Sequence, residues 1–132
     1  ASVTDRLNNT YEHVFHFVLN KKYFFDLDAI KILGANGHMK NPGDVWAINT
    51  QPLNGSHTAT FPEQLVEQIV LCGSPKGGIV FDPFLGTGTT WIVSDRLERS
   101  CIGFEINQEF FDFAQSRFKE SREFEQCQLP IS

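Results

Sequence analysis

The chain has 132 residues, of which 41% are hydrophobic and 20% charged, and its formal net charge at pH 7 is −5. This length is one domain's worth of chain and is large enough to bury a core, and no apolar run approaches the roughly 20 residues of a membrane span. The acidic balance argues against duplex DNA binding by this chain alone, because duplex-binding domains present a basic face or stripe. The three cysteines are an odd number without Cys-x-x-Cys spacing, which indicates neither a disulfide framework nor a zinc site. Free thiols suit a reducing cytoplasm.

The amino-terminal third of the chain predicts one strand and one basic turn. His13 to Val18 alternates weakly between polar and apolar residues and predicts a strand. In such a strand His13 and His16 face opposite sides, so they form a poor pair of metal ligands. Lys21-Lys22 precedes the aromatic run Tyr23 to Phe25, a combination that suits contact with a nucleic-acid backbone and its bases. The alternative, which residue preferences favour, is a solvated turn with the aromatic rings packed inward.

A second short strand and a helix are predicted next. Asp44 to Ile48 is typical of a short strand. Pro62 then stands at a first helical turn, and apolar residues recur at helical spacing from Glu63 to Val70. Gly73 is expected to end this helix, and Cys72 before it is expected to be a small core residue.

A strand, a glycine turn and a helix follow. The apolar run from Gly78 to Phe81 predicts a buried strand. The strand ends in Asp82-Pro83, and the chain turns through Gly86 and Gly88 before a helical segment that begins near Thr89. One face of this helix is apolar and is formed by Trp91, Ile92, Val93 and Leu97.

Another strand and a long helix complete the chain. Cys101 begins a strand pattern, where it is expected to be a small core residue, and Glu105 ends that strand. Asn107 is a suitable N-cap for a helix from Gln108 to about Arg122. The buried stripe of this helix is expected to consist of Phe110, Phe111, Ala114 and Phe118. The polar tail from Glu123 to Ser132 is expected to fray.

The order of these elements indicates both a fold class and a kind of site. Alternating strands and helices imply an α/β layer with a mostly parallel sheet and flanking helices. A Rossmann-type half-site holds an adenosine cofactor with elements in this order: a strand, a glycine turn, a helix, a second strand and an acidic residue. The glycines let the backbone approach the ligand, and Glu105 follows at about the spacing where a carboxylate takes both ribose hydroxyls. A Gly-x-Gly turn alone is more often an ordinary strand–turn–helix with glycines for backbone geometry, and only the surrounding residues favour a cofactor site.

The glycine turn also indicates which cofactor is bound. A P-loop needs Lys-Ser/Thr after its last glycine, and here Gly88 is followed by Thr89 and Thr90. The nicotinamide fingerprint needs a third glycine, and its place holds Trp91. Asp82 beside the turn suits a cofactor with a cationic amino-acid tail, because a carboxylate can lie near its ammonium group. The sequence therefore predicts S-adenosylmethionine.

Three segments resemble a known family. DPFLGTGTT, from Asp82 to Thr90, resembles the cofactor motif of DNA amino-methyltransferases, which methylate N6 of adenine or N4 of cytosine. Asn41 to Val70 resembles the segment that precedes this motif in the beta-type (permuted) members, of the restriction-modification kind. Arg6 to Ile30 resembles the strand that closes the catalytic half. The resemblance covers nearly all of Arg6 to Phe118.

The resemblance implies a Rossmann-like S-adenosylmethionine-dependent methyltransferase fold, of which residues 1–132 form a single, partial domain. Residues 6–30 would close the catalytic half, 29–41 would be a shortened recognition insert, 42–122 the cofactor half and 123–132 the tail. The implied cofactor-binding residues are Asp82, Pro83, Phe84, Leu85, Gly86, Gly88, Thr89, Glu105 and Ile106, with His57, Thr58, Thr60 and Phe61 at the methionine end. For several of these a simpler role stays open: core packing for Phe84, Leu85 and Ile106, a surface turn for His57, and a helix cap for Thr89.

Two departures from the family bear on catalysis. The family's catalytic tetrapeptide contains Pro-Pro, and this chain has no Pro-Pro pair. The stretch from Ala29 to Lys40 is also short for a recognition insert. The chain is therefore expected to hold the methyl donor, to contain no catalytic residues of its own and to be inactive alone. Double-stranded DNA would be contacted through parts mostly absent here, with a second chain or missing segment supplying the catalytic motif.

The predicted function is the cofactor-binding part of a site-specific DNA methyltransferase that acts on N6 of adenine or N4 of cytosine. The alternatives are a non-catalytic, cofactor-binding half of a split enzyme, and a methyltransferase for RNA or small molecules. No metal and no membrane partner are predicted.

Overall fold

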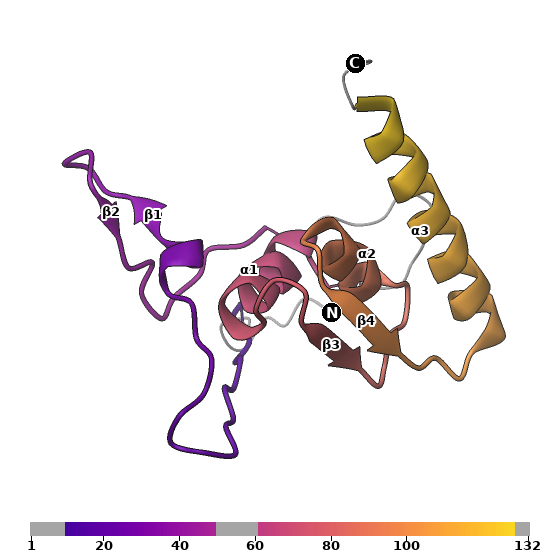
Figure 1. Ribbon diagram of the computed structural model, residues 1–132, viewed down its shortest axis with the longest axis horizontal. Coiled ribbons are helices and arrows are strands. Elements are labelled where there is room, and N and C mark those ends of the chain that lie inside the picture. Colours follow the sequence, from indigo (N-terminus) through magenta and orange to yellow (C-terminus); the bar gives the residue numbers. More distant parts are fainter. Residues whose placement is uncertain (1–9, 50–60, 129–132) are drawn as a thin grey trace, which may run out of the picture.

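The computed structural model describes residues 10–49 and 61–128, with side chains up to residue 124 (Figure 1). A small hairpin projects from one end of the molecule and a long helix from the other, with two helices and a pair of strands between them (Figure 1). In chain order the elements are η1 (Asp28–Ile30), β1 (Ile32–Leu33), β2 (Met39–Lys40), α1 (Glu63–Gly73), β3 (Ile79–Asp82), α2 (Thr89–Arg96), β4 (Ser100–Gly103) and α3 (Gln108–Gln128).

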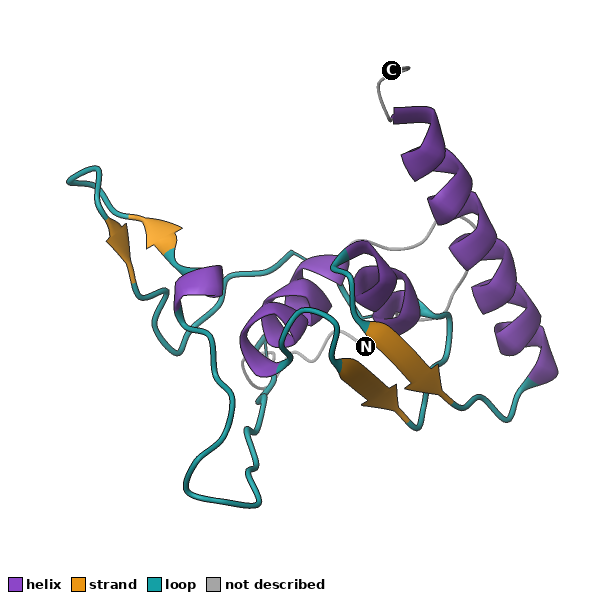
Figure 2. Cartoon of the chain, in the orientation of Figure 1, coloured by secondary structure: helices purple, strands orange, loops and turns teal. Residues whose placement is uncertain are grey.

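The central unit is the parallel pair β3–β4, which α2 connects. Val80 lies opposite Cys101 and Phe81 opposite Ile102 in the register. Figure 2 shows the carboxyl ends of both strands at the same edge, where loops lead into α2 and α3. The expected parallel pairing is therefore confirmed, and it places the glycine turn beside the segment that contains Glu105.

The hydrophobic core lies between the sheet and the helices α1 and α2. Its buried members are Val66, Val70 and Val93, and Val80 and Leu97 pack against them. Cys72 is buried and Cys101 half-buried, as small core residues, and burial raises the pKa of both thiols. The core thus covers only one face of the strand pair.

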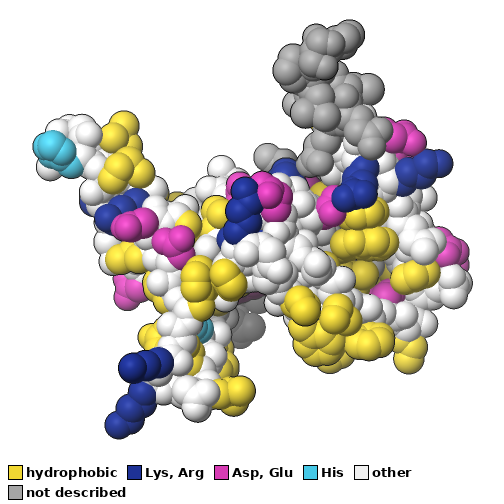
Figure 3. Space-filling view, viewed as in Figure 1, with side chains coloured by type: hydrophobic (Ala, Val, Ile, Leu, Met, Phe, Trp, Pro, Cys, Tyr) yellow, Lys and Arg dark blue, Asp and Glu magenta, His cyan; other side chains and the backbone are white. Residues whose placement is uncertain are grey.

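The expectation of a fully buried strand at Gly78 to Phe81 is wrong for one of its faces. Ile79 and Phe81 point away from α1 and α2 and are largely exposed. Figure 3 shows hydrophobic side chains gathered over the region of β3 and β4. The apolar run was predicted to be buried because strands covered on both faces have such runs, but the described residues cover only one face.

The helices begin where the sequence predicts, but α3 ends later. Pro62 precedes α1, which includes Gly73 as its last residue. Asn107 caps α3, with its side-chain oxygen accepting the backbone N–H groups of Glu109 (2.9 Å) and Phe110 (3.3 Å). The helix continues to Gln128 rather than ending near Arg122, because the residues that follow include good helix formers and no glycine or proline.

Helix α3 packs on α2 through its predicted stripe. Ala114 is fully buried, and Phe110, Phe111 and Phe118 are half-buried. The rings of Trp91 and Phe118 stack with their centroids 4.1 Å apart. Within the described part of the chain, no helix is long and apolar enough to cross a membrane.

The two other predicted strands are absent from the described residues. Residues 10–18 contain no strand, although rings two residues apart face the same side: Tyr11, His13, Phe15 and Phe17 have successive centroid distances of 5.1, 5.9 and 6.1 Å. Residues 44–48 likewise form no strand. A ladder needs a neighbouring strand as well as alternation, and the described residues supply none here.

The basic turn is exposed, but the aromatic residues after it do not pack inward as the favoured alternative predicted. Lys21 and Lys22 lie in an exposed bend. Tyr23, Phe24 and Phe25 are each about half exposed. The ring of His16 contacts those of Tyr23 and Phe25, so this aromatic cluster is local.

Replacing Gly88 by alanine tests the contact between α2 and α3. Gly88 has φ +83°, and a Cβ there would lie 2.8 Å from the Cβ of Ala114. Gly37 has nearly the same φ, +78°, but no atom within 4 Å of the Cβ position. A left-handed φ costs alanine about 1 kcal/mol, and overpacking at position 88 adds about 1–3 kcal/mol.

We therefore expect Gly88→Ala to lower the free energy of unfolding clearly more than Gly37→Ala. Urea unfolding followed by circular dichroism measures both. Equal losses in the two variants would contradict the close packing of α3 on the glycine turn.

Candidate functional site

The loops after β3 and β4 form one connected structure at the carboxyl edge of the sheet. The backbone N–H of Phe104 donates to the carbonyl of Asp82 (3.0 Å), and that of Leu85 donates to the carbonyl of Phe104 (2.8 Å). These bonds continue the pairing beyond the strands. Residues from the glycine turn and from the segment of Glu105 are therefore held side by side, as the order of sequence elements predicts.

Glu105 connects these two loops through both oxygens of its carboxylate. Oε2 accepts the backbone N–H of Gly86 at 2.8 Å, and Oε1 accepts that of Asn107 at 2.7 Å. Charged acceptors form the stronger class of hydrogen bond. Each oxygen of an ionised carboxylate has about two acceptor positions, so one on each remains for a ligand hydroxyl.

The two glycines of the turn have different surroundings. Gly86 has φ +55°, and the nearest atom to its Cβ position is the carbonyl oxygen of Phe84 at 3.8 Å. Gly88, at the N-cap of α2, faces Ala114 of α3 instead. The open space at Gly86 therefore allows a ligand to come close to the backbone of the turn, whereas the missing side chain of Gly88 makes room for α3.

The other predicted residues of the turn divide into exposed and buried groups. Asp82 accepts the N–H of Phe84 with Oδ1 at 3.0 Å, which fixes the turn at Pro83. Phe84 is 86% exposed and Ile106 is fully exposed. Leu85 is only 8% exposed, and its side chain lies against Gly103, where a Cβ would be 2.8 Å from Leu85 Cδ1. Core packing, the alternative left open for Leu85, is thus its observed role in the fold.

Arg117 is a part of this site that the sequence analysis missed. Its Nη1 donates to the carbonyl of Thr87 (2.7 Å), and it lies 3.3 Å from the hydroxyls of both Thr87 and Thr89. Its Nη2 is 3.6 Å from Glu63 of α1. The side chain is only 14% exposed, and this burial lowers the pKa of Arg117.

Arg117 therefore links the glycine turn to α3 and α1. The available signal was its position three residues after Ala114, which places a basic residue on the inward stripe of a helix. Thr89 is buried and contacts Arg117, while Gly88 holds the N-cap position without a side-chain cap. The cap alternative for Thr89 is therefore wrong.

The predicted residues at the methionine end are mostly outside the described part of the chain. His57, Thr58 and Thr60 lie outside the described residues. Phe61 is exposed just before α1.

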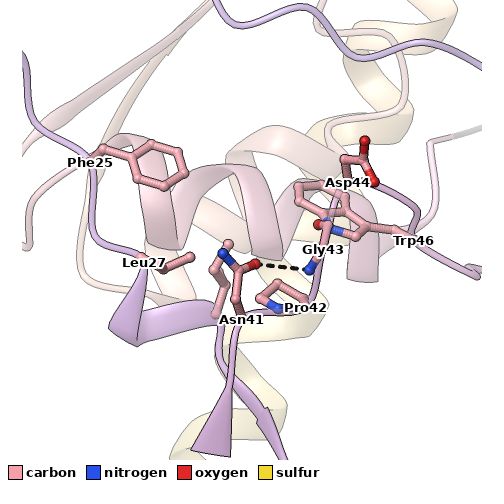
Figure 4. A pocket seen from close by; sticks show the side chains of 8 residues that line it. Phe25, Leu27, Asn41, Pro42, Gly43, Asp44 and Trp46 are labelled. Atoms are coloured by element: carbon pink, nitrogen blue, oxygen red, sulfur yellow. Dashed lines mark hydrogen bonds between the residues drawn. The ribbon is translucent and has the colours of Figure 1, made fainter.

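A separate hollow of about 530 Å³ lies between the segment before η1 and the segment after β2 (Figure 4). Asn41 accepts the N–H of Gly43 at 2.8 Å, and the indole of Trp46 donates to the carbonyl of Gly43 at 3.2 Å. The hollow shares no lining residue with the glycine turn. Its lining consists of Phe25, Leu27, Ile30, Asn41, Pro42, Gly43, Asp44 and Trp46.

Comparison with known proteins gives a family and several relatives. A family model described as DNA methylase (N6_N4_Mtase) matches residues 1–116. The type II methyltransferase M.SmaI of Serratia marcescens is 42% identical over 123 residues, which cover 92% of this chain and 42% of that protein. The type II methyltransferase M.Cfr9I of Citrobacter freundii is 36% identical over 118 residues, covering 89% of this chain and 39% of that protein. The chain thus spans about two fifths of the length of these relatives.

Solved structures agree on the fold. The structure named as the M1.HpyAVI–SAM complex matches with a TM-score of 0.54 at 28% identity, covering 73% of this chain and 43% of that one. The PvuII DNA methyltransferase, named cytosine-N4-specific, gives 0.60 at 23% identity, covering 76% and 40%. The predicted Rossmann-like α/β methyltransferase fold is confirmed.

Replacing Arg117 by methionine tests its role in holding the glycine turn. The change removes the donors that satisfy the carbonyl of Thr87, and leaving such a group unpaired costs about 1–3 kcal/mol. We expect that loss in the free energy of unfolding, together with faster hydrogen exchange at the amides of Gly86 and Gly88.

Arg96→Met is the matched control, because Arg96 also pairs with Glu63 (2.9 Å) but lies further out, on α2. An exposed pair contributes about 0–1 kcal/mol, so exchange at the turn should hardly change. Mass spectrometry measures the hydrogen exchange of these amides. An equal increase of the exchange rate in the two variants would show that Arg117 does not position the turn.

Proposed function

The chain belongs to the DNA methylase family, and from this premise we propose that it is the cofactor-binding part of a DNA amino-methyltransferase. The observation that carries the proposal is the carboxylate of Glu105, held by Gly86 and Asn107 at the carboxyl edge of the sheet. Ligands of open α/β sheets bind at this edge. The proposed ligand is S-adenosylmethionine, and the relative M1.HpyAVI, named as a complex with SAM, supports it.

The described residues fit this cofactor in character. Glu105 would accept the ribose hydroxyls with the remaining acceptor positions of its oxygens. Gly86 has open space where a side chain would stand, which suits close approach of the ligand. Asp82 would lie near the ammonium group of the methionine tail. Ile106 and Phe84, both exposed, offer apolar surface for the adenine ring.

Four of the predicted residues have a structural role instead of a direct contact with the cofactor. Leu85 and Thr89 are buried, Gly88 packs on α3, and Pro83 shapes the turn, so we assign them to holding the loop in place. His57, Thr58, Thr60 and Phe61 are proposed for the methionine end, on the resemblance alone. Residues 42–122 would then be the cofactor half.

When bound, S-adenosylmethionine supplies an electrophilic methyl group on its sulfonium. The proposed acceptor is the exocyclic amine of adenine (N6) or cytosine (N4) in double-stranded DNA, reached after the base leaves the stack. The family model, described as DNA methylase, supports DNA as the substrate. We place the reaction in the cytoplasm, where thiols such as those of Cys72 and Cys101 stay reduced.

The acceptor base has to be positioned by another part of the enzyme. This chain has no Pro-Pro pair, matches only 42% of the length of the Serratia marcescens relative, and carries a net charge of −5. These observations favour a cofactor half that becomes active with a catalytic part from a missing segment or a second chain. The test is to add that part and to offer duplex DNA, RNA and small amines as substrates. Methylation of duplex DNA alone would distinguish this function from the other methyltransferase classes.

Titration calorimetry with S-adenosylhomocysteine tests the cofactor site. We expect saturable binding that weakens at least about tenfold, or about 1.4 kcal/mol, in Glu105→Gln, because an amide offers one acceptor oxygen where the carboxylate offers two. Glu109→Gln is the control. It changes the net charge by the same amount, and Glu109 is exposed in the first turn of α3.

Binding that is unchanged in Glu105→Gln would remove Glu105 from the site. Equal weakening of binding in both variants would show that the loss of affinity comes from the change in net charge alone.

A further inference from the structure

Arg117 is the most deeply buried of the arginines that form ion pairs in the described part of the chain. Its side chain is 14% exposed, against 37% for Arg96 and 58% for Arg122. Burying a charge costs free energy unless hydrogen bonds and opposite charges compensate for it. Burial lowers the pKa of Arg117, and the charges of Glu63 and Glu120 oppose that change. A guanidinium in this position is therefore held by its contacts, and these contacts join two parts of the candidate site.

The first contact fixes a peptide group inside the glycine turn. Nη1 of Arg117 donates to the carbonyl of Thr87 at 2.7 Å, and the N–H of Gly88 in the same peptide group donates to the carbonyl of Leu85 at 3.0 Å. The carbonyl and the N–H of a trans peptide point in opposite directions, so a rotation of this group would break both hydrogen bonds. Gly86 and Gly88 both have positive φ, and glycine adopts positive and negative φ about equally well. Arg117 thus selects one of the conformations that the two glycines allow.

The second contact leads to the start of α1. Nη2 of Arg117 lies 3.6 Å from Oε1 of Glu63, the first residue of α1. Oε2 of Glu63 accepts Nη1 of Arg96 at 2.9 Å, so Glu63 also has a partner on α2. Phe61, two residues before Glu63, is the last of the residues proposed for the methionine end. One buried guanidinium therefore connects the glycine turn with the helix that follows this segment.

We propose that Arg117 is a positioning residue of the cofactor site, which holds the glycine turn and the start of α1 in one frame for the methionine end of the ligand. This inference rests on the proposed function for the identity of the ligand. Arg117 acts through Thr87 and Glu63, at which its donors are directed. The adenosine end is assigned to other groups, Glu105 and Ile106.

The two ends of the ligand should therefore respond differently to the loss of Arg117. S-adenosylhomocysteine has the adenosine and the amino-acid tail, whereas 5′-methylthioadenosine has the adenosine and the sulfur but no tail. A protein that is only partly in its competent conformation binds both ligands more weakly by the same factor. Loss of positioning at the turn and at α1 should instead weaken the ligand that has the tail. The ratio of the two affinities thus distinguishes a positioning role from a general loss of stability.

Titration of the ¹⁵N-labelled chain with each ligand, followed by nuclear magnetic resonance, measures this ratio. We expect Arg117→Met to weaken S-adenosylhomocysteine at least about tenfold, or about 1.4 kcal/mol, and 5′-methylthioadenosine less than about threefold. Arg117→Lys is the second variant, and it keeps the charge. It should lower the ratio in the same direction, because an ammonium group lacks the planar fork that reaches Thr87 and Glu63 together.

Two other arginines provide matched controls. Arg96→Met removes the other partner of Glu63, and Arg122→Met removes the pair with Asp95 (2.9 Å) that joins α3 to α2. Both make the same change in net charge as Arg117→Met and leave the donors of Arg117 in place. Both should therefore keep the wild-type ratio, and unchanged far-UV circular dichroism shows that each variant is folded.

Three results would overturn the positioning role while the wild-type chain still binds S-adenosylhomocysteine. They are equal weakening of the two ligands in the Arg117 variants, no weakening of either ligand, and an equal fall of the ratio in Arg96→Met. The last result would assign the effect to Glu63 instead of Arg117. Binding of neither ligand by the wild-type chain would overturn the proposed function as well, so the two failures are distinguishable.

Discussion

The hydrogen bonds that Glu105 accepts organise the whole carboxyl edge of the sheet. One oxygen holds the N–H of Gly86 in the loop after β3, and the other holds the N–H of Asn107 in the loop after β4. Asn107 in turn caps α3, and α3 carries Arg117 back to the carbonyl of Thr87. The glycine turn is thus fixed from both sides, by a carboxylate at one end and a guanidinium at the other. This rigidity would favour the proposed cofactor binding, because a site that is already fixed loses less conformational freedom when a ligand binds.

The features that the sequence predicted well are those determined by neighbouring residues. The start of α2 follows from the left-handed Gly88, and the start of α3 follows from the side chain of Asn107. The features that were missed depend on contacts distant in the chain. The strand predicted at His13 to Val18 has the right alternation but no neighbour in the described residues, and Arg117 contacts a carbonyl thirty residues away. The exposure of Phe81 likewise depends on which layers cover the sheet, and a strand's own residues do not contain that information.

In the proposed function, the described residues hold the methyl donor and another part of the enzyme places the acceptor base. The proposed donor site lies within one compact group of residues from β3, β4 and the loops that follow them. The sequence contains no Pro-Pro pair and has a net charge of −5, so the groups that would place a base in DNA are proposed to come from that other part.

Nuclear magnetic resonance of the ¹⁵N-labelled chain during addition of S-adenosylhomocysteine tests whether the cofactor binds at Glu105. We expect saturable shifts of the backbone amides of Gly86 and Asn107, because these two groups donate to the carboxylate of Glu105. The amides around the separate hollow, such as Gly43 and Trp46, should stay in place. Shifts confined to that hollow, with no change at Gly86 and Asn107, would show that the ligand does not bind at Glu105.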